Sequence, residues 1–114
     1  MATTESPEAA FLQKALTDPA WLLRELDLHS DRAAFLRVPE RTYRDSPFLD
    51  HRLSAPRQQP VIARLSSLTE SARAAPLPAT DWIFHPGHVG STLASRLLGE
   101  LNAILPVREP LPLR

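Results

Sequence analysis

The stretch that most constrains the fold of this chain lies near its C-terminal end and reads DWIFHPGHVGST, Asp81–Thr92. The apolar residues 82–84 have the character of a buried strand, and the proline and glycines of 86–90 interrupt it. From Ser91 onward, leucines recur at the spacing of one helix face. They are Leu93, Leu97, Leu98 and Leu101. The sequence therefore predicts a strand, a glycine-bearing turn and a helix.

The predicted turn has the chemistry of an anion site. A helix begins with backbone N–H groups that have no partner inside the helix, and the helix dipole adds partial positive charge there. Glycine lets the main chain approach an anion closely, and Ser and Thr add hydroxyl donors. The candidate binding residues are Pro86, Gly87, His88, Val89, Gly90, Ser91 and Thr92. An ordinary strand-to-helix turn in which Ser91 caps the helix is the alternative.

The turn differs from the loop that binds nucleoside triphosphates. That loop reads GxxxxGK[ST], and its lysine reaches the phosphates. In this chain Gly87 and Gly90 are three positions apart, and no lysine precedes Ser91. The sequence therefore disfavours a small-molecule kinase, which stays as an alternative function.

A family resemblance begins at these residues. PGHVGSTLASRLL resembles the 5′-phosphosulfate-binding loop of the sulfotransferase superfamily, P-[KR]-[ST]-G-[ST]-[ST], which lies between a buried strand and a helix. FHPGHVGSTLASRLL followed by LPVREPLPLR is similar to a bacterial sulfotransferase-like group with an FxFHxxxxxSTLLxRxL segment and a downstream REP. The resemblance covers residues 80–114. It differs at His88, which stands where the family has a basic residue and which donates one hydrogen bond when neutral.

The resemblance implies a function and its residues. The cofactor, as co-substrate, is 3′-phosphoadenosine 5′-phosphosulfate, the acceptor is a hydroxyl or amine on an unidentified small molecule or peptide, and no metal is needed. His88 is a candidate contact to the phosphosulfate. Glu109, twenty-one residues after His88, is the candidate base, with Arg108 as an anion contact or as the partner that orients it. An ordinary Arg and Glu pair at a strand end is the alternative.

The expected fold class is α/β, the N-terminal part of a P-loop-type three-layer sulfotransferase fold with an incomplete sheet. A second short strand is predicted over residues 103–107, where Pro106 restricts it to an edge. We expect a mostly helical N-terminal extension at 1–80 and the truncated P-loop domain at 81–114. The missing C-terminal part of the fold is the expected partner, and the chain alone is expected to be marginally stable and inactive. A non-catalytic fragment with a vestigial anion site is the remaining alternative.

The first eighty residues predict several short elements. Ser6 as N-cap and Pro7 at the first helical position open a helix over 9–16. Asp18-Pro19 repeats this pattern and predicts a second helix over 20–26. The other predicted elements are a strand or helix turn at 32–38, a short helix at 40–48, an extended segment at 59–65, and a helix opened by a capping box at 67–70 and ending near 75.

Composition narrows the classes of partner. Thirteen basic and thirteen acidic residues give no net charge, so nucleic acid is an unexpected partner. Cysteine is absent, and the four histidines lack metal-ligand spacing, so we predict no metal site. No secretory signal and no run of eighteen apolar residues is present, and a cytoplasmic location is the expectation.

Overall fold

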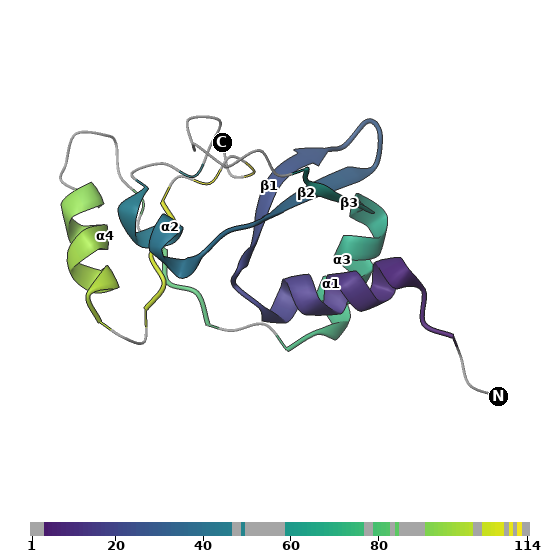
Figure 1. Cartoon of the computed structure of the whole chain (residues 1–114), viewed down its shortest axis with the longest axis horizontal. Coiled ribbons are helices and arrows are strands. Elements are labelled where there is room, and N and C mark those ends of the chain that lie inside the picture. Colours follow the sequence, from purple (N-terminus) through teal and green to yellow (C-terminus); the bar gives the residue numbers. More distant parts are fainter. Residues whose placement is uncertain are drawn as a thin grey trace. The chain divides into compact units, whose positions relative to one another are not determined.

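The computed structural model describes residues 4–46, 49, 59–76, 79–82, 84, 91–101, 104–108, 110 and 112. In that part of the chain it is a small mixed α/β protein (Figure 1). The elements in order are α1 (Pro7–Thr17), β1 (Trp21–Asp27), β2 (Arg32–Arg37), α2 (Glu40–Asp45), β3 (Val61–Arg64), α3 (Leu65–Ala74) and α4 (Ser91–Gly99). Contacts group the chain into two units. Unit 1 is Met1–Val38 with Ala55–Leu77, and unit 2 is Pro39–Ser54 with Pro78–Arg114.

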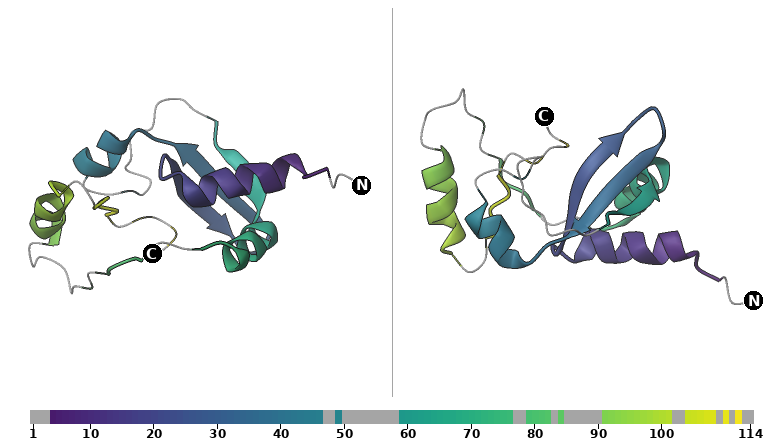
Figure 2. Two further views of the ribbon diagram at one scale, coloured as in Figure 1. Left: turned by 90° about the horizontal axis from the view of Figure 1, so that it is seen from below. Right: turned by 45° about the horizontal axis from the view of Figure 1, so that its top comes forward.

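Unit 1 contains a three-stranded antiparallel sheet in the order β1-β2-β3. Phe35 of the central strand lies opposite Leu23 on one side and Val61 on the other. A bulge between Leu23 and Glu25 shifts the register of β1. Figure 2 shows β1 and β2 as a hairpin, with α1 and α3 beside it. The expected α/β class is confirmed, but this sheet is antiparallel and formed by residues 21–64.

The apolar core of unit 1 lies on the face of the sheet that α1 and α3 cover. Its buried members are Leu12, Ala33, Phe35 and Ala63, and Leu68 of α3 packs against them. The ring of Phe11 meets the rings of Trp21 and Phe35 edge to face, at centroid distances of 4.9 and 5.4 Å. Burial of each large apolar side chain contributes about 1.5–3 kcal/mol. Burial of this core therefore favours the folded state of unit 1.

Both helices of unit 1 begin at identifiable caps. The N–H of Ala9 donates to Oγ of Ser6 at 3.1 Å, so Ser6 caps α1 as predicted. The capping box predicted at 67–70 is wrong, because α3 begins at Leu65, and its N-cap, Arg64, makes no side-chain cap bond. Asp31, in the hairpin turn, takes that role instead. Its carboxylate accepts from the N–H of Ser66 at 2.8 Å and from the Ser66 hydroxyl at 2.6 Å.

The helix predicted over residues 20–26 is wrong, because Trp21–Asp27 forms β1. The carboxylate of Asp18 accepts from the N–H of Ala20 at 2.9 Å, in a tight turn before β1 and not at the start of a helix. A short apolar run is compatible with a helix or with a strand, and here the pairing with β2 favours the strand. Trp21 and Leu23, two positions apart, both pack against the core that contains Leu12, which fits the period of a strand.

The other predictions for residues 32–75 are confirmed in outline. Residues 32–37 form β2, 61–64 form β3 and 65–74 form α3. The short helix expected over 40–48 is α2, Glu40–Asp45, and residues 47 and 48 lie outside the described part.

Unit 2 contains α2, α4 and the described residues around 104–108. The buried strand predicted at 82–84 is wrong for Trp82 and Phe84, which are 59% and 88% exposed and outside any strand, and Ile83 lies outside the described residues. Residues 104–107 likewise form no strand, and Ala103 lies outside the described part. The N–H of Ile104 donates to the carbonyl of Leu101 at 3.0 Å, and the carbonyl of Arg108 accepts from the N–H of Leu49 at 2.9 Å. The domains 1–80 and 81–114 stay a prediction, since the two units are groups of contacts with different boundaries.

Candidate functional site

Helix α4 begins at Ser91, where the glycine-bearing turn predicts a helix start. The turn residues Pro86, Gly87, His88, Val89 and Gly90 lie outside the described residues, as do the side chains of Ser91 and Thr92. The backbone of Ser91 and Thr92 is helical. Their N–H groups therefore belong to the first turn, which has no acceptor inside the helix.

The leucine stripe of α4 is exposed to solvent in this structure. Leu93 and Leu97 are each 63% exposed, and Leu101, two residues after the helix, is 54% exposed. The opposite side of α4 carries small residues, with Ser95 partly buried and Gly99 buried. A Cβ atom added at Gly99 would lie 3.0 Å from Cγ of Pro106, so the backbone there approaches the proline ring closely. The helix therefore packs through its small side and leaves its apolar side free.

Arg108 is 5% exposed and binds the end of α2. Its Nε donates to the carbonyl of Ser46 at 2.9 Å, and its Nη2 donates to the carbonyls of Tyr43, at 2.7 Å, and of Arg44. These carbonyls lie at the C-terminal end of α2, where the helix dipole favours a cation. Burial lowers the pKa of Arg108, and the positive charge of Arg96 lowers it further, although an arginine stays protonated.

This arrangement bears on the sequence prediction for Arg108 and Glu109. Arg108 was expected to contact an anion or to orient Glu109, and its described hydrogen bonds all go to backbone carbonyls. Glu109 lies outside the described residues. Sequence reasoning missed the helix end as the partner of Arg108, because more than sixty residues separate the two segments.

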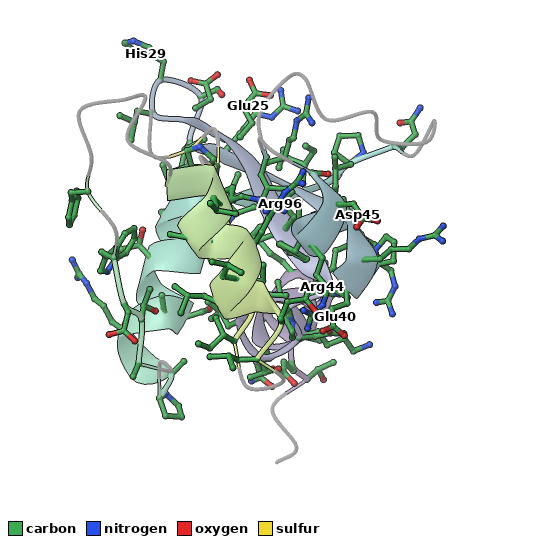
Figure 3. All side chains as sticks on the ribbon, turned by 90° about the vertical axis from the view of Figure 1, so that its left-hand side faces the viewer. Glu25, His29, Glu40, Arg44, Asp45 and Arg96 are labelled. Atoms are coloured by element: carbon green, nitrogen blue, oxygen red, sulfur yellow. The ribbon has the colours of Figure 1, made fainter. Side chains whose placement is uncertain are left out.

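A hollow of about 310 Å³ lies in unit 2 between α2 and α4. Its lining residues are Arg44, Asp45, Arg96, Gly99, Glu100 and Pro106. Figure 3 shows Arg44 close to Glu40, and their Nη2 and Oε1 atoms are 2.9 Å apart. Arg44 also donates from Nη1 to the carbonyl of Gly99, at the end of α4. Both terminal nitrogens of Arg44 thus have a partner, and the two arginines and two acids of the lining balance in charge.

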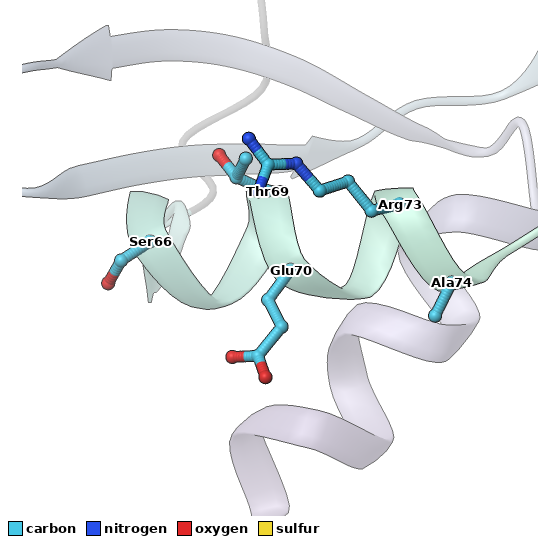
Figure 4. A pocket seen from close by; sticks show the side chains of 5 residues that line it. All are labelled: Ser66, Thr69, Glu70, Arg73 and Ala74. Atoms are coloured by element: carbon cyan, nitrogen blue, oxygen red, sulfur yellow. The ribbon is translucent and has the colours of Figure 1, made fainter.

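A second hollow, of about 700 Å³, lies on the surface of α3 in unit 1 (Figure 4). It is large enough for a small ligand. Its lining residues, Ser66, Thr69, Glu70, Arg73 and Ala74, all come from one helix. Figure 4 shows Thr69 and Arg73 extending from one side of the helix and Glu70 from another. Side chains that diverge in this way do not converge on a ligand.

Two features are absent from the described residues, a metal site and a membrane-spanning helix. Among them, no group of three or more His, Cys, Asp or Glu is placed to hold a metal ion. No helix in this part of the chain has the length and apolar character needed to cross a membrane. No protein-family model, curated protein or solved structure matches the chain. A function for this chain is therefore supported only by its own residues and by the resemblance over 80–114.

Proposed function

We propose that this chain carries the phosphosulfate-binding segment of a sulfotransferase-like protein, with 3′-phosphoadenosine 5′-phosphosulfate as the co-substrate. The observation that supports the proposal is the start of α4 at Ser91, directly after the glycine-bearing turn. The N–H groups of Ser91 and Thr92 then belong to a helix N-terminus, which favours an anionic group. The helix has nine residues, enough for an aligned set of peptide dipoles.

Each proposed residue has a distinct task. The turn residues 86–90 and the first turn of α4 bind the phosphosulfate through N–H donors, and Ser91 and Thr92 add hydroxyl donors. Donors fixed in this way stabilise negative charge that grows on the leaving phosphate. His88 donates a hydrogen bond to the same group. Glu109 accepts the proton of the acceptor hydroxyl or amine, a step that contributes roughly 10²–10⁴-fold in such reactions. When bound, the co-substrate supplies the sulfuryl group.

The proposal includes the P-loop-type three-layer fold of the sulfotransferase family. In that fold, strands of a parallel sheet flank the helix that follows the binding loop. The exposed leucines of α4 support this part of the proposal, because they form an apolar face that such a sheet would cover. The expected complement is a further part of the same fold, supplied in cis or by a second polypeptide.

A thermal-shift titration with adenosine 3′,5′-bisphosphate tests the binding step. A ligand at a hundred times its dissociation constant adds about 2.7 kcal/mol of stability to the folded state. We expect a shift for the wild-type chain and smaller shifts for His88→Ala and Ser91→Ala. Ser95→Ala is the matched control, since it makes the same change on α4 away from the first turn, and it is expected to leave the shift unchanged.

Parallel titrations separate the alternatives. A shift with Mg-ATP and none with the bisphosphate would favour the kinase over the sulfotransferase. A cooperative melt that neither ligand changes would overturn cofactor binding by this chain and favour a vestigial anion site. Equal losses in Ser91→Ala and Ser95→Ala would assign the effect to helix stability and remove the support for the loop.

A further inference from the structure

One face of α4 presents a row of leucines to solvent. Leu93 and Leu97 lie one helical turn apart, and Leu101 follows one turn later. The N–H of Leu101 donates to the carbonyl of Leu98 at 3.0 Å, so the chain stays coiled past the end of the helix and Leu101 stays close to the line of the other two. Leu98 borders this row and is 40% exposed. Exposed apolar side chains that lie together favour association with another surface.

The opposite side of α4 is fixed to the rest of unit 2. Arg44 of α2 donates to the carbonyl of Gly99, and the backbone of Gly99 lies close to the ring of Pro106. A rotation of α4 that turned the leucines inward would break both contacts. The leucine face is therefore directed outward, and its cover has to come from another surface.

The charges beside the leucines indicate which surface fits. With about 3.6 residues per turn, Arg96 and Glu100 both lie on one border of the leucine row, one turn apart. Both side chains are exposed, and neither forms an ion pair with another described residue. A border with one cation and one anion has no net charge, so it does not select a charged membrane surface or a charged peptide. It is complementary to a copy of itself that runs in the opposite direction.

We propose that the leucine face of α4 binds a second copy of this chain in an antiparallel, two-fold symmetric helix pair. When the pair is centred near Leu98, Arg96 of each copy lies opposite Glu100 of the other. Leu97 then lies close to its own symmetry mate, and Leu93 of one copy lies beside Leu101 of the other. A two-fold contact of this kind closes after two copies. The chain has no net charge, so the two copies do not repel each other at long range.

This dimer does not depend on the proposed function. The sheet of the proposed fold would cover the same leucines, so that sheet and a second copy are alternative covers of one face. A chain that holds such a sheet is expected to be monomeric through α4. The two proposals also fail separately, because a flat bisphosphate titration leaves the dimer in place and a monomeric chain leaves the bisphosphate result in place.

Sedimentation equilibrium of the whole chain, from micromolar to millimolar concentration, measures the association. We expect a monomer–dimer equilibrium for the wild type. Leu97→Glu places two carboxylates together near the two-fold axis and removes two leucines from the contact, which should raise Kd about a hundredfold. Leu28→Glu is the matched control, because Leu28 is 83% exposed in the hairpin turn of unit 1, and it should leave Kd unchanged. A wild-type chain that stays monomeric, or equal losses in the two variants, would overturn the proposal.

Charge exchange at positions 96 and 100 tests the antiparallel orientation. Arg96→Glu and Glu100→Arg each place like charges opposite each other, and each should raise Kd about tenfold. The double variant restores opposite charges and should restore the wild-type Kd. An equimolar mixture of the two single variants should form a mixed dimer. This rescue does not come from helix stability, because each chain of the mixture keeps its own like-charge pair.

The same variants identify a different mode of association. In a parallel pair, residue 96 would meet residue 96, so the single charge changes would leave Kd unchanged. In non-specific apolar aggregation, neither the double variant nor the mixture would recover association by charge. Either outcome would contradict the antiparallel dimer.

Discussion

Units 1 and 2 are held together by different kinds of interaction. Unit 1 has an apolar core between its sheet and two helices, in which Leu12 and Ala33 are fully buried. In unit 2, the three leucines of α4 and Leu101 after it are at least 40% exposed, and the described contacts between distant segments are largely bonds from arginine to backbone carbonyls. Arg108 caps α2, and Arg44 donates to the carbonyl of Gly99 at the end of α4.

The difference shows which part of the chain can specify its own structure. Apolar burial is non-directional and large, and it favours the folded state of unit 1 whatever the surroundings. Hydrogen bonds are modest in net effect, because water competes for the same groups in the unfolded chain. We therefore expect unit 1 to be the more stable unit, and the predictions below test this order.

The largest effect is expected for Phe35→Ala in the core of unit 1. Phe35 is 4% exposed and its ring contacts that of Phe11. Truncation of a buried phenylalanine removes its transfer free energy and leaves a cavity, at a cost of about 3–5 kcal/mol. Urea unfolding monitored by Trp21 fluorescence, in a Trp82→Phe background, measures the change in unit 1.

Phe84→Ala in unit 2 is the control for this prediction. Phe84 is 88% exposed, and its described ring contact is a stacking with Trp82 at 6.3 Å. Exposed substitutions of this kind change stability by about 0.5 kcal/mol or less. A cost at Phe84 equal to that at Phe35 would contradict the proposed contrast between the units.

The sequence predicted the elements whose signals are local. Ser6 and Pro7 identified the start of α1, and the residues around Ser91 identified the start of α4. The helix predicted at 20–26 is wrong because Trp21–Asp27 pairs with β2, whose residues lie outside the segment that carries the helix signal. The strand expected at 82–84 failed because an apolar run shows that burial is favourable and not which surface provides it.

The candidate site divides in the same way. The start of α4 at Ser91 could be predicted, because helix N-termini have a local signature, and the anion site at the turn before it stays a prediction. The capping of α2 by Arg108 could not be read, because it depends on a fold that brings residues 43–46 to residue 108. The sequence shows that Arg108 is charged, but it does not show which groups the guanidinium contacts in the folded chain.

The second largest effect is expected for Asp31→Ala at the start of α3. The carboxylate of Asp31 accepts from the N–H and the hydroxyl of Ser66, and loss of such a cap costs about 1–2 kcal/mol. Asp31 has φ of 54°, which alanine tolerates poorly and asparagine well. Asp31→Asn should therefore lose less than half as much stability in the same urea experiment. Equal losses would assign the effect to charge alone.

A smaller effect, of opposite sign in two backgrounds, is expected for Gly99→Ala in unit 2. The new Cβ would meet Cγ of Pro106 at 3.0 Å, and relieving such crowding costs about 1 kcal/mol or more. Alanine also favours a helix over glycine by up to about 1 kcal/mol. In a Pro106→Ala background the crowding is absent and Gly99→Ala should be stabilising. Thermal unfolding of the four proteins gives the coupling, and its absence would show that this contact is not formed.

The smallest effect is expected when the pH is lowered, and it should reduce the stability of unit 1. The Ser67 hydroxyl and the N–H of Arg64 donate to Glu8 and lower its pKa from the ordinary value of 4.5. Because the folded chain then binds the proton less tightly, this stabilisation is complete above pH 4.5 and is lost as the pH falls through the lower, folded-state pKa. The pKa of Asp27 is likewise lowered, mainly by hydrogen bonding from Ser30, so it contributes stability of the same sign. The guanidinium of Arg108 keeps its charge throughout, so its cap in unit 2 has no such dependence.

Urea unfolding followed by Trp21 fluorescence at neutral pH and at about pH 3.5 measures this effect. Between the two pH values, the urea midpoint should fall less in Glu8→Gln than in wild type. Glu5→Gln, which removes a nearby charge ahead of the cap, should match wild type. The same acid loss in Glu8→Gln and wild type would exclude Glu8 as its source.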